Sequence, residues 1–155
     1  MRNIMGVLAT ALLLFSQLAV AKEIAVLLPL TGPITQIEKS ELSKEVVDAL
    51  SDKFELRYGE EVDRVVKQVF QDESRKNDCD ETNCYRRIAA YYHAEMLVVL
   101  RVAETGKGRY LVTAHLYDVP TGNMIFSREA ECTQCSFEKL KVLCKELSLS
   151  MSKAK

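Results

Sequence analysis

The chain of 155 residues is 48% hydrophobic and 28% charged, with six glycines and three prolines. This apolar fraction excludes an intrinsically disordered chain, and the low glycine and proline content excludes collagen-like and low-complexity proteins. One compact domain is therefore expected. The 21 basic and 22 acidic residues leave a formal charge of −1. Since no surplus of cations is present to neutralise phosphates, a dedicated nucleic-acid-binding protein is not expected.

The first 21 residues have the pattern of a secretory signal peptide. Arg2 precedes an apolar stretch at residues 4–15, and residues 19–21 form an A-x-A cleavage site. A transmembrane anchor is the competing interpretation, but it needs about 20 continuous apolar residues. Ser16 and Gln17 interrupt the apolar run before that length is reached. The pattern therefore favours export with cleavage.

This signal determines the expected organisation of the mature protein. We expect cleavage after Ala21, a single domain over residues 22–151 and a frayed C-terminus over residues 152–155. No cysteine lies within the signal or at position 22, so lipid modification of the bacterial lipoprotein type is not expected. The remaining apolar segments are too short to span a bilayer. The mature protein is predicted to be soluble in an oxidising compartment, the bacterial periplasm.

The first half of the mature chain is predicted to alternate strands and helices. A continuous apolar run at residues 23–30 predicts a strand that is buried on both faces. A helix follows the capping pattern Thr35-x-x-Glu38. Residues 54–58 alternate as a period-two strand does, and a second helix begins near Glu60. The predicted apolar stripes of the two helices are Ile34, Ile37, Leu42, Val46, Val47 and Leu50, and then Val62, Val65, Val66, Val69 and Phe70.

The second half is predicted to contain one helix, three consecutive strands and a closing helix. These elements are a helix over about residues 84–93, strands over residues 96–100 and 110–117, a third strand from Met124, and a helix capped by Ser136. The resulting order is β-α-β-α-α-β-β-β-α. It predicts an α/β fold with α+β character, in which one mixed sheet has helices packed on it.

All five cysteines lie in the mature chain. Cys79 and Cys84 form a C-x4-C motif, and Cys132 and Cys135 form a C-x2-C motif. In an oxidising compartment both motifs are expected to form local disulfides, with crossed pairing between the motifs as the alternative. Cys144 lies on the apolar stripe of the last helix and is predicted to be a buried free thiol.

Other chemistry has weaker support in the sequence. Cys132 and Cys135 precede a helix, so a thiol-disulfide oxidoreductase is the main enzymatic alternative. A zinc site of four cysteines is a weaker alternative, and covalent haem is excluded because Ser136 replaces the histidine of C-x-x-C-H. His93 and His115 have no catalytic or metal-binding spacing, and no nucleotide-binding glycine motif is present. No catalytic residue, metal or cofactor is predicted.

Four segments carry a resemblance to a known family. They are the opening strand at residues 24–29, the C-x4-C loop that leads into a helix containing residues 88–90, the strand at residues 94–99, and the Y-D-V-P-T-G turn at residues 117–122. Together they resemble the α/β domain shared by TolB N-terminal regions, CsgG-type curli-secretion proteins and LpoB-type activators of penicillin-binding proteins. The resemblance extends over most of residues 23–150.

This resemblance implies a non-enzymatic module that docks onto other cell-envelope or outer-membrane proteins. The sequence lacks the lipidation cysteine of the lipoprotein members and the extra strands of the pore-forming ones, so a soluble periplasmic adaptor is expected. The predicted contact is the polar side of strand 110–117, at Thr113, His115 and Tyr117, or an edge strand. A periplasmic redox protein that uses Cys132 and Cys135 is the alternative.

Overall fold

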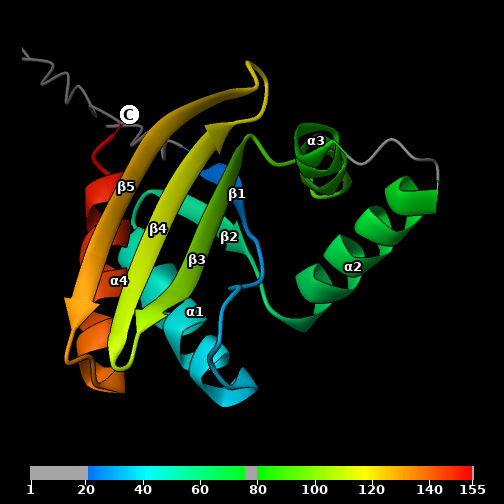
Figure 1. Cartoon of the computed structure of the whole chain (residues 1–155). Coiled ribbons are helices and arrows are strands. Elements are labelled where there is room, and N and C mark those ends of the chain that lie inside the picture. Colours follow the sequence, from blue (N-terminus) through cyan, green and yellow to red (C-terminus); the bar gives the residue numbers. More distant parts are fainter. Residues whose placement is uncertain (1–20, 76–79, 155) are drawn as a thin grey trace, which may run out of the picture.

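Five strands and four helices form the protein in the computed structural model, which describes residues 21–75 and 80–154 (Figure 1). Residues 1–20 of the predicted signal peptide, which covers residues 1–21, lie outside the described residues. In chain order the elements are β1 (Glu23–Leu27), α1 (Gln36–Leu50), β2 (Phe54–Arg57), α2 (Glu60–Arg75), α3 (Glu81–Tyr91), β3 (Met96–Gly106), β4 (Arg109–Asp118), β5 (Asn123–Thr133) and α4 (Phe137–Met151). The predicted element order and the single mixed sheet are confirmed.

The sheet has the strand order β2-β1-β3-β4-β5. β1 pairs in parallel with both β2 and β3, whereas β3, β4 and β5 form an antiparallel meander. The central place of β1 explains why its sequence is continuously apolar, because a strand covered on both faces has no polar side. The meander places β5 at one edge of the sheet and β2 at the other.

The helices divide between the two faces of the sheet. Leu42 of α1 and Leu140 of α4 belong to one core cluster, with inward residues of all five strands. Val62 of α2 and Ile88 of α3 belong to the other cluster, which draws on β1 and β3 and to which β5 contributes no residue. Figure 1 shows the result: α1 and α4 lie behind the sheet, while α2 and α3 leave the near face of β4 and β5 uncovered.

Three of the helices begin at capping side chains. Thr35 and Glu38 form a capping box at α1, and the hydroxyl of Ser136 accepts a hydrogen bond from the backbone N–H of Lys139 at α4. Asp80 caps α3 by accepting from the N–H of Thr82. The helix was predicted to start near residue 84, and it starts about one turn earlier, at Glu81, because Asp80 supplies the N-cap.

The two helices on the second face are tied together by an ion pair. The guanidinium of Arg87 on α3 binds the carboxylate of Glu73 on α2, and Glu73 is only 5% exposed. Arg87 is itself exposed, but its charge compensates a buried carboxylate that would otherwise be costly. None of the helices in residues 21–75 and 80–154 is long and apolar enough to cross a membrane.

Candidate partner-binding surface

The predicted contact residues lie on the face of the sheet that α2 and α3 leave partly open. Thr113, His115 and Tyr117 alternate along β4 on this face, and their cross-strand neighbours on β5 are Glu129, Ser127 and Met124 respectively. The three β4 residues are half-buried, whereas the three β5 residues are exposed. The open sheet face is therefore defined as Thr113, His115, Ser127, Glu129 and Glu131, and it ends at the outer edge of β5.

Tyr117 differs from the other two because α3 packs over it. Its ring centroid lies 5.5 Å from that of Tyr85, which is buried on α3. The hydroxyl of Tyr85 donates a hydrogen bond to Glu81, and the guanidinium of Arg101 on β3 pairs with the same carboxylate. Arg101 also lies 3.1 Å from the Tyr85 oxygen. These four side chains form a cluster that fixes α3 against the sheet.

The electrostatics of this cluster keep its phenols protonated. Burial raises the pKa of Tyr85 well above its usual range, and the hydrogen bond to Glu81 raises it further. Burial, and then the charge of Glu81, raise the pKa of Tyr117 in the same direction. At neutral pH both side chains act as hydrogen-bonding and packing groups and have no tendency to ionise. The arrangement is suited to holding two elements together.

This cluster has almost no signature in the sequence. The only local signal is Arg101, a charged residue inside the apolar run of β3, which must point to the opposite face from its apolar neighbours Leu100 and Val102. Its partners are 16 and 20 residues away on another element. No periodicity in the sequence links them, so only the packing of α3 against β3 reveals the contact.

His115 lies at the border between the cluster and the open part of the face. Its ring centroid is 6.2 Å from that of Tyr117. Within the described parts of the chain, its Nδ1 atom is buried and has no hydrogen-bond partner. The structure therefore places Thr113 and His115 beside β5, and places Tyr117 under α3, so the three predicted residues are not equally accessible.

The outer edge of β5 is the longest unpaired edge of the sheet. β5 has 11 residues, against four in β2 at the other edge, and contains neither proline nor glycine. Glu129 and Glu131 lie on the open sheet face and are exposed, and their β4 neighbours Thr113 and Leu111 are uncharged. Among the described residues neither carboxylate has an ion-pair partner. The edge is therefore long and carries two carboxylates on the open sheet face, while the exposed Arg128 of the same strand lies on the opposite face, across from Ala114.

The C-x2-C motif joins the end of β5 to α4. The sulfur atoms of Cys132 and Cys135 lie at disulfide-bonding distance, and their Cα atoms are 5.2 Å apart. Cys84 is buried in the core cluster on the opposite face of the sheet from Cys135, so the alternative of crossed pairing through Cys84 has no geometric support. Cys79 lies outside the described residues.

Cys144 lies fully buried on α4, at the position the helical stripe predicts. Burial alone raises the pKa of its thiol to about 12, so it carries no charge at neutral pH. In the segments that the structure describes, no group of three or more His, Cys, Asp or Glu side chains could hold a metal ion.

Comparison with known proteins finds similarity in structure only. No family model matches the sequence, and no curated protein matches it. A PelC dodecamer from Paraburkholderia phytofirmans superposes with a TM-score of 0.53 at 13% identity, covering 86% of this chain and 90% of that chain. The LpoB C-terminal domain from Salmonella enterica superposes with a TM-score of 0.50 at 16% identity, and the match covers 75% of this chain and 87% of that chain.

TolB from Acinetobacter baumannii has a TM-score of 0.53 at 11% identity, and the match covers 86% of this chain but 28% of TolB. The present chain is therefore similar to one part of TolB. Identities this low establish a shared fold. The fold expected from the resemblance to TolB and LpoB domains is thus the fold that the chain adopts.

Proposed function

We propose that this protein is a non-enzymatic adaptor of the bacterial cell envelope, which binds another envelope protein by strand addition at the outer edge of β5. The observation that carries the proposal is the unpaired, 11-residue edge beside an uncovered face. The fold shared with LpoB and TolB domains, and the resemblance of the sequence to that family, support an envelope role.

Strand addition follows from the hydrogen-bonding groups of an edge strand. Alternate residues of β5 direct their backbone N–H and C=O groups away from β4. In most proteins such edges are short, or are interrupted by proline or covered by another element, because they otherwise pair with another chain. β5 is long, its one register shift lies near its start at Ile125, and α4 packs against its inner face only. A partner strand would gain main-chain hydrogen bonds along this edge.

The charges on β5 specify the chemistry of the partner. Glu129 and Glu131 project from the same face at a spacing of two residues, without a cation opposite them on β4. An added strand with Lys or Arg at alternate positions would place its cations next to these carboxylates. Thr113 and His115 lie one strand further in and would contact the partner's side chains on this face. Tyr117 contributes by supporting α3.

In this proposal the signal peptide is cleaved after Ala21 and the mature protein resides in the periplasm. The supporting observation is the ordered sequence of charge, apolar stretch and A-x-A motif at residues 1–21. In that oxidising compartment Cys132 and Cys135 would form a disulfide, as would Cys79 and Cys84. The first of these bridges would attach the end of the docking strand to α4.

The geometry of the C-x2-C motif favours the adaptor over the redox enzyme. A thiol-disulfide oxidoreductase uses an accessible cysteine at a helix N-terminus, where the helix dipole lowers the thiol pKa. Here Cys132 lies in β5 and is 7% exposed. Cys135 directly precedes Ser136, the N-cap of α4, and is half-buried, so the buried member of the pair is the one farther from the helix. A purified protein without activity in an insulin-reduction assay is expected, and rapid turnover would support the enzyme instead.

The docking site is tested with a defined peptide of seven residues in which lysine and valine alternate. Amide NMR spectra of the purified protein should show saturable shifts along Asn123–Thr133, with β2 unaffected. Combined substitution of Glu129→Lys and Glu131→Lys should weaken binding by about tenfold or more, because two attractive contacts become repulsive. Glu146→Lys, an exposed charge reversal on α4, is the matched control and should bind as wild type.

Two results of this titration would count against the proposal. One is the absence of saturable shifts in β5. The other is equal affinity of the double variant and the control, with circular dichroism showing that both are folded. A peptide with glutamate in place of lysine should bind much more weakly than the lysine peptide.

A further inference from the structure

A second candidate site lies at the end of the sheet where β1 and β2 terminate. After β1 the chain passes to α1 on one face, and after β2 it passes to α2 on the other face. The two connections therefore diverge and leave a crevice at the carboxyl ends of the parallel strands, which is where open α/β sheets bind ligands. A pocket of about 390 Å³ lies there, within the size range of small-molecule sites.

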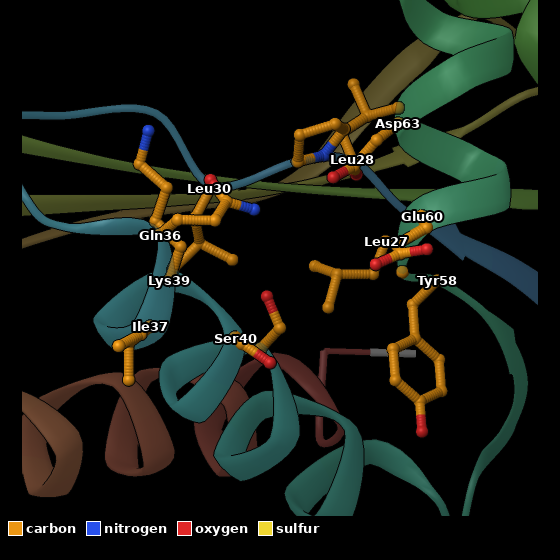
Figure 2. A pocket seen from close by; sticks show the side chains of 13 residues that line it. Leu27, Leu28, Leu30, Gln36, Ile37, Lys39, Ser40, Tyr58, Glu60 and Asp63 are labelled. Carbon is orange, nitrogen blue, oxygen red and sulfur yellow. The ribbon is translucent and has the colours of Figure 1, made fainter.

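The floor of this crevice is apolar. Leu27, Leu28 and Leu30 line it from β1 and the following loop (Figure 2). Two exposed apolar side chains also line it, Ile37 at 73% and Tyr58 at 47% exposure. The helical stripe predicted Ile37 to be buried, and that prediction was wrong, because the buried residues of α1 begin only at Leu42. A ligand with an apolar body would cover both side chains.

Opposite charges face each other across the crevice. Lys39 and Ser40 project from α1 on one side, and Glu60 and Asp63 from α2 on the other (Figure 2). In the described parts of the chain no hydrogen bond or ion pair engages the side chain of Lys39, Glu60 or Asp63. Partial burial and then the charge of Glu60 raise the pKa of Asp63, and Lys39 offsets this only in part. The site thus holds separated charges of both signs.

We infer that this crevice binds a zwitterionic ligand with an apolar side chain, of the amino-acid or short-peptide class. Its ammonium group would lie between Glu60 and Asp63, and its carboxylate would lie against Lys39 and Ser40. The apolar side chain would cover the leucine floor. This site is distinct from the β5 edge and does not depend on the proposed docking function.

Calorimetry and amide NMR test the inference with two named probes, free leucine and the unblocked dipeptide leucyl-leucine. At least one of them should bind saturably, with shifts centred on Leu28, Ser40 and Gly59. The comparison of the two distinguishes a free amino acid from a peptide as the preferred source. N-acetylated and C-amidated forms of the dipeptide should each bind at least about tenfold more weakly, since each loses one charged contact.

Variants identify the two sides of the site. Lys39→Gln and Asp63→Asn should each weaken binding by about tenfold or more, whereas Lys44→Gln and Asp48→Asn, exposed positions on α1 outside the crevice, should not. Equal binding by the blocked and unblocked dipeptides, or by all four variants, would overturn the inference. So would the absence of saturable binding by both probes to the folded wild-type protein. Shifts confined to β5 would also contradict it, and the docking proposal would be unaffected.

Discussion

Cys144 and Glu73 show how single buried residues determine the chemistry of this protein. Cys144 is a thiol with no exposed surface, and Glu73 is a carboxylate that is almost fully buried. Burial raises the pKa of the thiol, which therefore stays neutral. The carboxylate is compensated by Arg87 from the neighbouring helix. Burial thus makes the Cys144 thiol unreactive at neutral pH. It also requires the Glu73 carboxylate to pair with Arg87, and this ion pair holds α2 against α3.

The first prediction concerns the reactivity of Cys144. Its thiol ionises near pH 9 in an unfolded chain and near pH 12 in the folded protein. At pH 8 alkylation of the native protein should therefore be slower than in urea by a factor of about a thousand or more. The Cys144 thiol loses its proton at a lower pH in the unfolded chain than in the folded protein. Its ionisation therefore lowers the free energy of unfolding as the pH rises from 9 to 12. Mass spectrometry of iodoacetamide adducts measures the rate, and rapid labelling of native Cys144 would contradict the prediction.

Local pattern predicted some residues and could not predict others. The burial of Cys144 and the caps at Thr35 and Ser136 follow from spacing within a single helix. The pairing of Glu73 with Arg87, and the cluster around Arg101, depend on how separate elements pack together. A prediction from an apolar stripe treats the helix as packed on the core along its whole length. For this reason it wrongly predicted that Ile37 is buried.

Among the elements, α1 has the most completely defined start. The backbone N–H and hydroxyl of Thr35 both donate to the Glu38 carboxylate at 2.8 Å, and the Thr35 hydroxyl accepts from the Glu38 N–H at 3.2 Å. The backbone hydrogen bond, and then the hydroxyl, hold the pKa of Glu38 below its usual value. This cap also positions the first turn of α1, which lines the crevice.

The second prediction is that Thr35→Ala lowers the free energy of unfolding by about 1 kcal/mol at neutral pH, the usual cost of losing an N-cap side chain. A carboxylate with a lowered pKa contributes stability above its unfolded pKa and loses that contribution as the pH falls through its folded pKa. The difference in the free energy of unfolding between Thr35→Ala and wild type should therefore be smaller at pH 3 than at pH 7. Urea unfolding at both pH values measures it, and a difference that grows at pH 3 would exclude the cap as its origin.

Element boundaries were harder to predict than element types. The sequence indicated a short strand at residues 96–100, whereas β3 extends from Met96 to Gly106. Beyond Leu100 the strand carries exposed polar residues, so it loses the apolar signal while it keeps its hydrogen bonds to β4. β5 also contains exposed polar residues, so its length could not be predicted from its apolar residues either. The proposed docking edge could therefore not be recognised from hydrophobicity.

The whole molecule is asymmetric, because four helices do not cover both faces of a five-stranded sheet equally. One core cluster extends across all five strands, whereas the other ends at β4. The part of the sheet that α2 and α3 leave uncovered ends at the free edge of β5. The C-x2-C motif lies at the junction between β5 and α4. The open sheet face is thus a consequence of topology, and the cysteine pair would stabilise one end of it.

The third prediction concerns that pair at the level of global stability. Replacing both Cys132 and Cys135 with serine should lower the free energy of unfolding by about 2 kcal/mol, because so short a loop restricts the unfolded chain only modestly. Urea denaturation under non-reducing conditions measures the change. Wild-type protein treated with reductant should lose the same amount. If the variant and the reduced protein are as stable as oxidised wild type, the two cysteines do not form a stabilising bridge.

If β5 is the docking strand, a partner must lie against it in the cell, and crosslinking in intact cells tests this directly. A photoreactive amino acid would replace Ser127 or Arg128 on β5, or Lys44 or Glu146 on the exposed sides of α1 and α4. We predict that the two β5 positions yield the same adduct with one envelope protein, and that the two helix positions yield none. Adducts from the helix positions alone, or no adduct from either β5 position, would contradict the account.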